Sequence, residues 1–307
     1  MSTLSKNFFD LSSNRKLCYY SSIESKSEDD EFFPIIYFHG FPGSGLEAKF
    51  CSDSAYKAKC GIYSFDRPGF GFSDPQIDEG DRMNQFAEDI WEFISSKKWK
   101  SFSIIGTSGG WPWCLAFLAS YLKKPKENRA RLEAAASVAG VHIPAGVDEM
   151  MPNNKKLFEL GNQIREEESY LPWMMIRGSF SLMYYFTYCP EWMYRKIIDA
   201  SFGDMPQIDK DRIQENLTVF NEMTHSAMRQ GSSACVDELK AICKPRYEFE
   251  DEIKKCYVNN PESNDLPKIT LFHGDLDVNV PMVSFIKLHS VFFDMLFIHY
   301  LLNISVS

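Results

Sequence analysis

The residue whose type and setting most clearly indicate chemistry is Ser108, which has a glycine two positions away on either side, Gly106 and Gly110. An apolar strand is predicted over Ser101–Ile105, and apolar residues suited to a helix follow over Trp113–Tyr121. In this G-x-S-x-G pattern the serine lies on a sharp turn between the strand and the helix, where larger neighbouring side chains would collide. The turn pushes the hydroxyl out of the sheet, so the pattern predicts a nucleophilic serine.

The residue after this serine adds a second group. The turn puts the Gly109 N–H at the start of the predicted helix, where it is aimed at developing negative charge. A phosphate-binding loop is the alternative interpretation of the same glycines. That interpretation is disfavoured because the P-loop lysine and the Gly-x-Gly-x-x-Gly pattern are both missing.

Elements of two kinds alternate along the first part of the chain. Continuous apolar runs indicate strands covered on both faces, and segments with helical period, such as Met83–Ser96, separate them. This alternation predicts a mostly parallel sheet with helices on both faces. The further predicted strands are Phe33–Phe38, Gly61–Phe65, Leu132–Ala139, Ile269–Phe272 and Met295–Leu301.

The alternation stops over residues 141–266, a block with helical patterns that is rich in methionine and aromatic residues. We expect residues 1–140 and 267–307 to form the α/β core and residues 141–266 to form an inserted helical lid. The alternative for the aromatic side chains is that they build the core of the lid itself.

Composition excludes several classes of partner. The chain has 307 residues and a net charge of -9, which would repel nucleic acid and anionic membrane surfaces. The N-terminus lacks the pattern of a secretory signal, and the apolar stretch near the C-terminus is too short for a membrane span. None of the eight cysteines forms a C-x-x-C pair, so we predict a cytoplasmic protein with reduced thiols, no metal and no cofactor.

Four segments with residues that could take part in chemistry follow predicted strands. In α/β sheets, ligands bind at the carboxyl ends of the strands. The four segments begin at His39, Asp66, Gly106 and His273. Taken together they resemble the α/β-hydrolase fold family, from about residue 33 to the C-terminus. The resemblance implies the α/β-hydrolase fold.

The segment from His39 to Gly43 (H-G-F-P-G) resembles the oxyanion loop of that family, whose N–H donor would be that of Phe41. The segment from Asp66 to Ser73 (D-R-P-G-F-G-F-S) resembles its D-R-x-G-x-G-x-S turn, which we take as architectural. The segment from His273 to Pro281 resembles its acid loop, which implies that Asp277 is the triad acid. Asp275 is the competing carboxylate, and the spacing of the family makes it a neighbour of the acid.

The chemistry that the resemblance implies is acyl transfer. Ser108 would attack a carbonyl, Asp277 would orient a histidine that takes its proton, and the N–H groups of Gly109 and Phe41 would hold the oxyanion. Haloalkane dehalogenases and epoxide hydrolases carry aspartate at the nucleophile position, so a serine indicates an ester, thioester or amide. The lid composition favours a small apolar acyl substrate.

The sequence departs from the family pattern at the histidine, which should follow the last strand. Residues 303–307 contain none, and Ser305 lies about where it is expected. His299, inside the predicted last strand, is the possible base, against the alternative of a buried core histidine. His289 comes too early in the chain for this role.

Three accounts fit this departure: a truncated version of an active enzyme, an inactive relative, or an enzyme with a relocated base. The apolar tail after Val291 favours truncation or altered splicing. The function expected is therefore that of a serine hydrolase. The alternatives are a non-catalytic binding protein on the same fold, and a lyase or acyltransferase, since the fold hosts many chemistries.

Overall fold

A computed structural model gives the structure of the chain. It describes residues 4–23, 32–76, 81–127, 129–143, 147–148, 150–167, 169–203, 205–244, 246–260, 263, 265–274, 277, 280 and 296–301.

The described residues form one eight-stranded sheet in the order β1-β2-β4-β3-β5-β6-β7-β8. The hairpin β1–β2 and the pair β2–β4 are antiparallel, and all other neighbouring pairs are parallel. The mostly parallel sheet predicted from the apolar runs is therefore confirmed. The strands are β1 (Ser5–Asp10), β2 (Lys16–Ser21), β3 (Phe33–Phe38), β4 (Cys60–Phe65), β5 (Ser101–Thr107), β6 (Arg131–Val138), β7 (Lys268–Gly274) and β8 (Leu296–Leu301).

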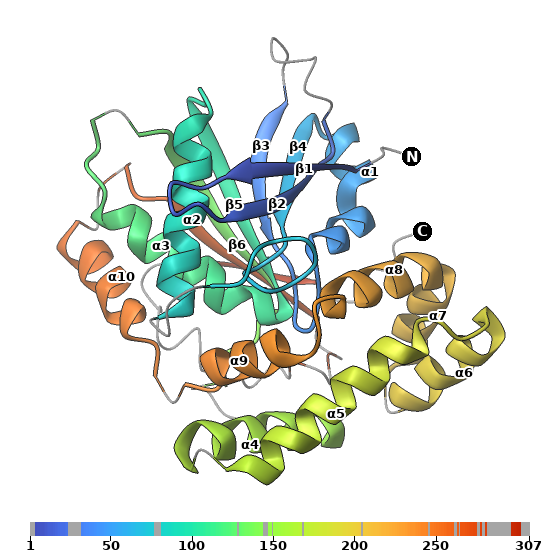
Figure 1. Ribbon diagram of the computed structural model, residues 1–307. Coiled ribbons are helices and arrows are strands. Elements are labelled where there is room, and N and C mark those ends of the chain that lie inside the picture. Colours follow the sequence, from blue (N-terminus) through green and yellow to red (C-terminus); the bar gives the residue numbers. More distant parts are fainter. Residues whose placement is uncertain are drawn as a thin grey trace.

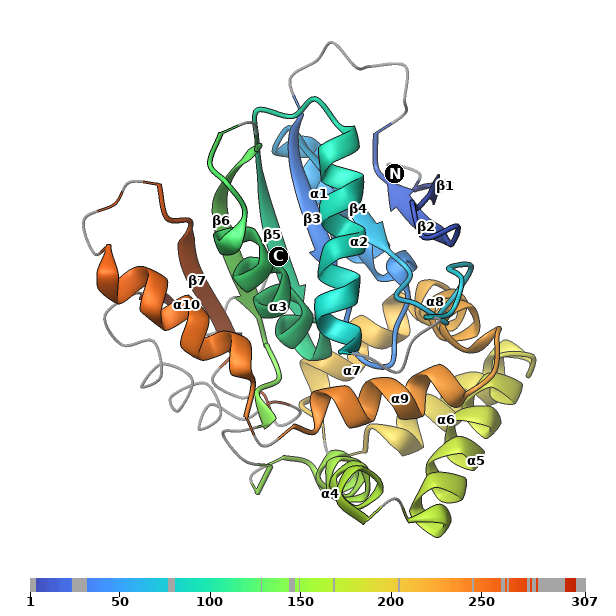
Figure 2. The same ribbon diagram turned by 60° about the vertical axis from the view of Figure 1, so that its left-hand side comes forward.

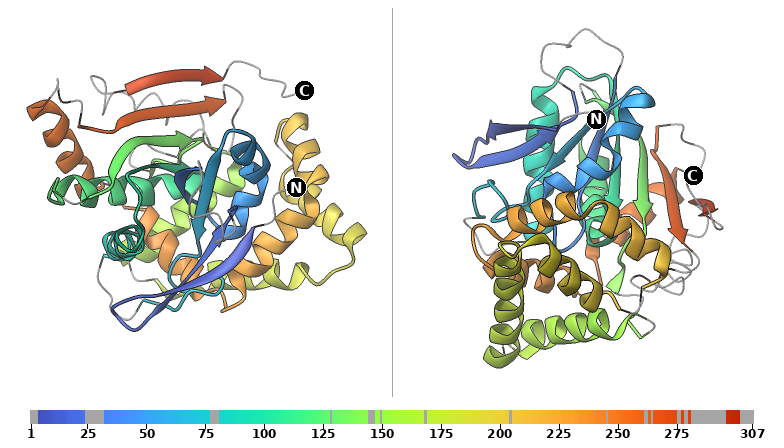
Figure 3. Two further views of the ribbon diagram at one scale, coloured as in Figure 1. Left: turned by 90° about the horizontal axis from the view of Figure 1, so that it is seen from above. Right: turned by 90° about the vertical axis from the view of Figure 1, so that its right-hand side faces the viewer.

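Helices cover both faces of the sheet (Figures 1 and 2). Helices α2 (Arg82–Ser96), α3 (Trp111–Lys123) and α10 (Glu248–Asn259) lie side by side on one face. Helix α1 (Lys49–Lys57) lies on the opposite face, beside β4 (Figure 3). Helix α3 is buried almost all round, as expected for a helix between the sheet and two other helices.

Aromatic side chains fill the space between the sheet and these helices. Phe102 of β5 packs edge-to-face on Phe117 of α3, and Phe86 of α2 packs in the same way on Trp113 of α3. Such ring pairs add about 0.5–1.5 kcal/mol each beyond the burial of their area. They fix α3, and with it the turn that precedes α3, against the sheet.

Six further helices lie at the carboxyl end of the parallel strands (Figures 1 and 2). No strand occurs among the described residues between β6 and β7, in agreement with the helical pattern of that block. Helix α10 falls within this stretch of sequence but packs on α3. The six are α4 (Pro152–Glu167), α5 (Tyr170–Phe186), α6 (Glu191–Ser201), α7 (Gln207–Glu215), α8 (Leu217–Met228) and α9 (Ser233–Ile242).

Among the described residues, no helix combines the length and the apolar character needed to cross a bilayer.

Candidate functional site

Ser108 follows β5 directly and opens a short 3-10 turn, η2 (Ser108–Gly110), which leads into α3. Its φ is 48°, in the left-handed region that non-glycine residues rarely adopt and that costs free energy to maintain. The Val141 N–H donates to the carbonyl oxygen of Ser108 at 2.9 Å and helps to hold the turn. Ser108 is half-buried and therefore not fully enclosed by the protein.

The two flanking glycines are needed for close packing. A Cβ added to Gly110 would lie 2.2 Å from the carbonyl oxygen of Phe38, which is far inside contact distance. A Cβ added to Gly106 would lie 2.8 Å from the Cβ of Cys114. The sharp turn expected from the spacing of these glycines is therefore present.

The loop after β3 passes directly beside this turn. A Cβ added to Gly109 would lie 3.0 Å from the backbone nitrogen of Phe41, and one added to Gly40 would lie 3.4 Å from the Cβ of Ser108. Apart from bonds within helices and strands, the N–H groups of Phe41 and Gly109 donate to no backbone carbonyl in the described part of the chain. The structure thus brings together three of the residues that the sequence singled out.

Arg67 holds the carbonyl side of this loop. Its Nη1 donates to the carbonyl oxygen of His39 at 2.6 Å, and its Nη2 donates to that of Gly40 at 2.8 Å. Its Nε donates to Glu238 of α9 at 3.0 Å, and both side chains of this ion pair are almost fully buried. Sequence reasoning took the Arg67 turn as architectural. In the structure, Arg67 also donates hydrogen bonds to two carbonyl oxygens of the loop beside Ser108.

Glu47, from the turn η1 (Gly45–Ala48), holds the other side of the loop. The Gly40 N–H donates to both carboxyl oxygens, at 3.0 and 2.9 Å, and the Tyr37 hydroxyl donates to Oε1 at 2.8 Å. Burial raises the pKa of Glu47 to about 7, while the hydrogen bonds from Tyr37 and Gly40 work in the opposite direction. Nothing in the sequence singled out this carboxyl group.

His39 and Asp66 have structural surroundings. The Nδ1 of His39 lies 2.8 Å from the carbonyl oxygen of Gly40, and burial and the nearby Arg67 charge hold the pKa of this histidine well below its usual range. Asp66 accepts the N–H groups of Gly45 and Phe72, each at 2.9 Å. A neutral His39 and an N–H-bonded Asp66 fix the turns on which the loop rests.

Asp277 lies just beyond the end of β7. Its Oδ1 accepts the Val280 N–H at 3.0 Å, and its Oδ2 is 3.9 Å from Nε2 of His273. In the parallel sheet β6 lies between β7 and β5, so Asp277 and Ser108 follow the carboxyl ends of two strands that are one strand apart. The competing Asp275 lies outside the described residues.

Four of the six histidines have described side chains, and each ring makes a hydrogen bond. Besides His39, His142 bonds Glu250 at 2.7 Å, His225 bonds Thr187 at 2.9 Å, and His273 bonds the Val280 carbonyl at 2.5 Å. His299 lies in β8, where its backbone pairs with that of Phe272. His289 and Ser305 lie outside the described residues.

In the part of the chain that the structure describes, no group of three or more His, Cys, Asp or Glu side chains could hold a metal ion.

Comparisons with known proteins agree with this fold. A sequence model of the family described as alpha/beta hydrolase fold matches residues 34–187, half of the 307-residue chain. The chain belongs to the α/β-hydrolase fold family. No curated protein sequence matches it significantly.

Solved α/β-hydrolase structures match almost the whole chain at low sequence identity. A bromoperoxidase from Bacillus anthracis is 15% identical, with a TM-score of 0.60 over 97% of this chain and 91% of that one. A structure from a study of carboxylesterases of Nitrososphaera gargenis is 12% identical, with a TM-score of 0.59 over 97% and 90%. The esterase EaEST from Exiguobacterium antarcticum is 13% identical, with a TM-score of 0.56 over 96% and 90%. At such identities the likeness shows the shared fold.

In this α/β-hydrolase, the sequence did not predict the residues that hold the loop after β3 in place. Arg67 and Glu47 were missed because their partners are contributed by separate elements. A buried arginine needs a carboxylate, and here the carboxylate is 171 positions further along the chain. The available signal was the charged side chain of Arg67 in an otherwise apolar and glycine-rich turn, which must find a partner if it is buried.

Proposed function

We propose that the chain is a serine hydrolase that acts on esters, thioesters or amides of small apolar acyl groups. The observation that carries the proposal is the strained, half-buried Ser108, with the backbones of Gly109 and Phe41 packed beside it. Strain of this kind persists where the surrounding structure enforces it, and it is concentrated at functional sites.

In the proposed reaction, the Ser108 hydroxyl attacks the carbonyl carbon of the substrate and its proton passes to a base. The N–H groups of Phe41 and Gly109 donate to the oxyanion, and each such donor is worth about 3 kcal/mol in the transition state. The protonated base then gives its proton to the departing alcohol, thiol or amine. Water, deprotonated by the same base, releases the acid from Ser108.

For the base we propose His299, oriented by Asp277. The support is by elimination: the rings of His39, His142, His225 and His273 already make hydrogen bonds elsewhere in the described structure. Asp277 follows β7, the strand that pairs with the strand of His299.

Helices α4–α9 are proposed to form the lid over this site. Phe180 of α5 packs edge-to-face on Phe41, with ring centroids 5.7 Å apart, so an aromatic wall from the helical block reaches the oxyanion loop. Such a wall suits an apolar acyl group. Hydrolases of this fold from Exiguobacterium antarcticum and Nitrososphaera gargenis, described as an esterase and as carboxylesterases, are consistent with ester substrates.

A cytoplasmic location is part of the proposal. All eight cysteines are free thiols, and Cys18, Cys114, Cys235 and Cys243 are buried. Free thiols persist in reducing compartments.

A fluorophosphonate probe tests the proposal, because it phosphonylates only an activated serine. The probe should label Ser108 in the native protein, and Ser108→Ala should abolish labelling. Ser101→Ala removes a half-buried serine at the other end of the same strand and should leave labelling intact. A folded protein that resists the probe and hydrolyses no p-nitrophenyl ester would refute the proposal and favour a binding protein.

The same probe tests the base. His299→Gln should slow labelling by several orders of magnitude, since loss of a triad histidine costs on the order of a millionfold in another serine hydrolase. His225→Gln, in the helical block, is the control. Equal labelling of the two variants would exclude His299 as the base.

A further inference from the structure

Helix α5 presents an apolar face to solvent, although a helix that is exposed on one side normally carries charged and polar residues there. Arg177 is the single charged residue among its seventeen. The inner face of α5 is buried through Ile176 and Phe180, and the helix packs on α4, α8 and α9. The right-hand view of Figure 3 shows α5 at the outer edge of the helical block. A helix that is apolar all round is normally covered all round, so α5 lacks a partner on its outer side.

The apolar area on this side is large. Fully covering a large apolar or aromatic side chain removes about 100–250 Å² from water, so six that are half to two-thirds exposed leave on the order of 600 Å². Single exposed apolar residues are normal, whereas a contiguous patch of this size marks an interaction site. We call these six residues, which are 46–70% exposed, the outer face of α5: Tyr170, Leu171, Met174, Met175, Leu182 and Tyr185.

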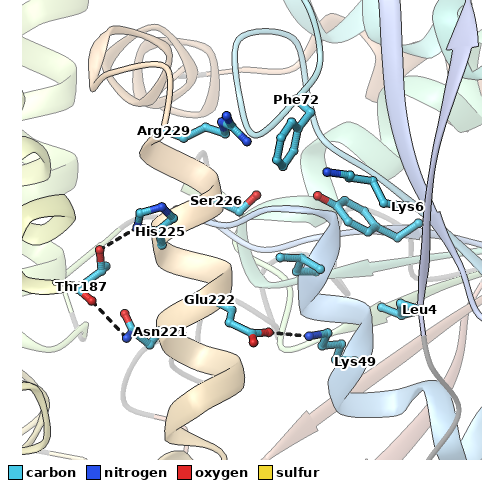
Figure 4. A pocket seen from close by; sticks show the side chains of 12 residues that line it. Leu4, Lys6, Lys49, Phe72, Thr187, Asn221, Glu222, His225, Ser226 and Arg229 are labelled. Carbon is cyan, nitrogen blue, oxygen red and sulfur yellow. Dashed lines mark hydrogen bonds and ion pairs between the residues drawn. The ribbon is translucent and has the colours of Figure 1, made fainter. Parts of the chain in front are cut away.

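The outer face does not belong to a cavity. Small molecules bind in concave sites, and α5 contributes none of its residues to the cavity of about 460 Å³ that lies beside α8 (Figure 4). The lining residue nearest to α5 in sequence is Thr187, just beyond its end, which is hydrogen-bonded to His225 and Asn221 of α8. The outer face is the convex side of a helix, which suits a macromolecular surface.

The apolar residues of the outer face are arranged symmetrically about Gly178. This glycine is the midpoint of α5, and a Cβ added to it would meet nothing within 4 Å, so a second backbone can approach closely there. Alternating steps of four and three residues, the spacing with which two helices pack side by side, connect the following positions. They are Leu171, Met175, Gly178, Leu182 and Tyr185.

This symmetry makes the outer face complementary to itself. If a second α5 crosses the first in the antiparallel direction at Gly178, each Gly178 meets its own copy. Leu171 then lies opposite Tyr185 of the second copy, since the two are equally far from the midpoint. In the same way Met175 lies opposite Leu182. Every contact is made twice, as a two-fold axis requires.

A bilayer surface fits the outer face less well. Helices that lie on membranes carry lysine and arginine along their polar side, which attract anionic lipid. Helix α5 offers Arg177 alone, and the net charge of -9 on the chain opposes binding to an anionic surface.

We propose that the outer face of α5 binds a second copy of this chain, in an antiparallel pair of α5 helices with its two-fold axis at Gly178. Burying the face on both copies removes roughly 1,200 Å² in total, the lower end of the range for specific interfaces. We therefore expect a dissociation constant of about 1–10 µM. The interface does not depend on the chemistry proposed for Ser108.

Sedimentation equilibrium between about 1 and 100 µM tests the dimer, because the mass should rise from one chain to two over this range. Leu182→Glu should raise the dissociation constant at least about a hundredfold, since an unpaired carboxylate would be buried in each half of the interface. Val258→Glu is the matched control, because Val258 is also an exposed apolar residue of a helix, α10, and it should leave the dimer unchanged. Circular dichroism shows whether both variants are folded.

Disulfide cross-linking tests the direction of the pair. A mixture of the Leu171→Cys and Tyr185→Cys variants should form a 171–185 disulfide between chains, which requires Cα atoms within about 7 Å. Leu171→Cys alone should give no more than the background of the native protein with its eight cysteines. In the antiparallel pair the two copies of position 171 are about 20 Å apart.

A native protein that stays monomeric at about 100 µM would overturn the proposal, as would equal weakening by Leu182→Glu and Val258→Glu. Cross-linking of Leu171→Cys with itself above the native background would show a parallel pair and would also overturn it. Flotation of monomeric protein with phosphatidylcholine vesicles, lost in Leu182→Glu, would assign the face to a bilayer instead. Ser108→Ala should form dimers like the native protein, whichever way the hydrolase test turns out.

Discussion

The substitution Glu238→Gln tests how the helical block controls the loop beside Ser108. It keeps the shape of the side chain but removes the charge that faces Arg67, and both partners are almost completely buried. Removing one partner of a buried ion pair costs about 3–5 kcal/mol. Because glutamine still offers an oxygen to Arg67, we expect the lower end, about 3 kcal/mol in the free energy of unfolding.

Arg67 also donates to the carbonyl oxygens of His39 and Gly40, so its displacement should move the proposed Phe41 donor. Complete loss of such a donor costs about a hundredfold to a thousandfold in kcat. A donor that is displaced but still present should cost less, about tenfold to a hundredfold. KM should change little, because the effect falls on the transition state.

The chain contains a matched control in the buried pair Arg15–Asp89, whose nitrogen and oxygen are 2.5 Å apart. Asp89 belongs to α2 and Arg15 follows the turn between β1 and β2, so the pair does not touch the loop after β3. Asp89→Asn should destabilise the protein by a similar amount and leave kcat unchanged.

Urea unfolding gives the stability of both variants, and hydrolysis of p-nitrophenyl butyrate gives kcat where both are folded. Hydrogen exchange of residues 39–43 provides a readout that needs no turnover, and it should accelerate in the Glu238 variant alone. The reasoning fails if the two variants lose stability equally and show the same kcat and the same exchange in this loop.

Two further predictions concern stability. Burial raises the pKa of Glu47 to about 7, so the folded state favours the protonated carboxyl group. The stability that this protonated group contributes is present at low pH and is lost as the pH rises through the folded-state pKa of about 7. Urea unfolding of Glu47→Gln at pH 5 and pH 9 should show the variant gaining about 2.5 kcal/mol relative to the native protein across this range, and parallel pH profiles would contradict the assignment. Gly110→Ala should cost about 3 kcal/mol in thermal or urea unfolding, because the new Cβ would meet the Phe38 carbonyl at 2.2 Å. Gly178→Ala, on an exposed face of α5 with nothing within 4 Å of the new Cβ, should instead stabilise the protein by about 0.5–1 kcal/mol, and equal effects of the two changes would show that packing is not the cause.

The sheet and the turn at Ser108 could be predicted because their signals are local. Continuous apolar strands identify parallel strands covered on both faces. The flanks of Ser108 must be small, since β3 and α3 approach the turn closely. Helix α1 gave no such signal, because Ser52 is its only fully buried residue and no apolar stripe is visible along it.

The supports of the candidate site could not be predicted, for a different physical reason. The pair Arg67–Glu238 and the bonds from Gly40 to Glu47 depend on which elements meet in space. A buried charge shows in the sequence only as one charged residue among many, and its partner is identified only when the chain is folded. The same holds for Lys6 and Arg229, which are far apart in the sequence and both lie over the ring of Phe72.

Position 41 combines two duties that can change independently. Its backbone would serve the reaction, whereas its ring forms a wall together with Phe180. Every amino acid except proline carries the same main-chain N–H, so a different side chain at 41 reshapes the wall and keeps the donor. Substitutions at positions 41 and 180 could therefore change the preferred substrate, while the main-chain N–H donors would stay the same.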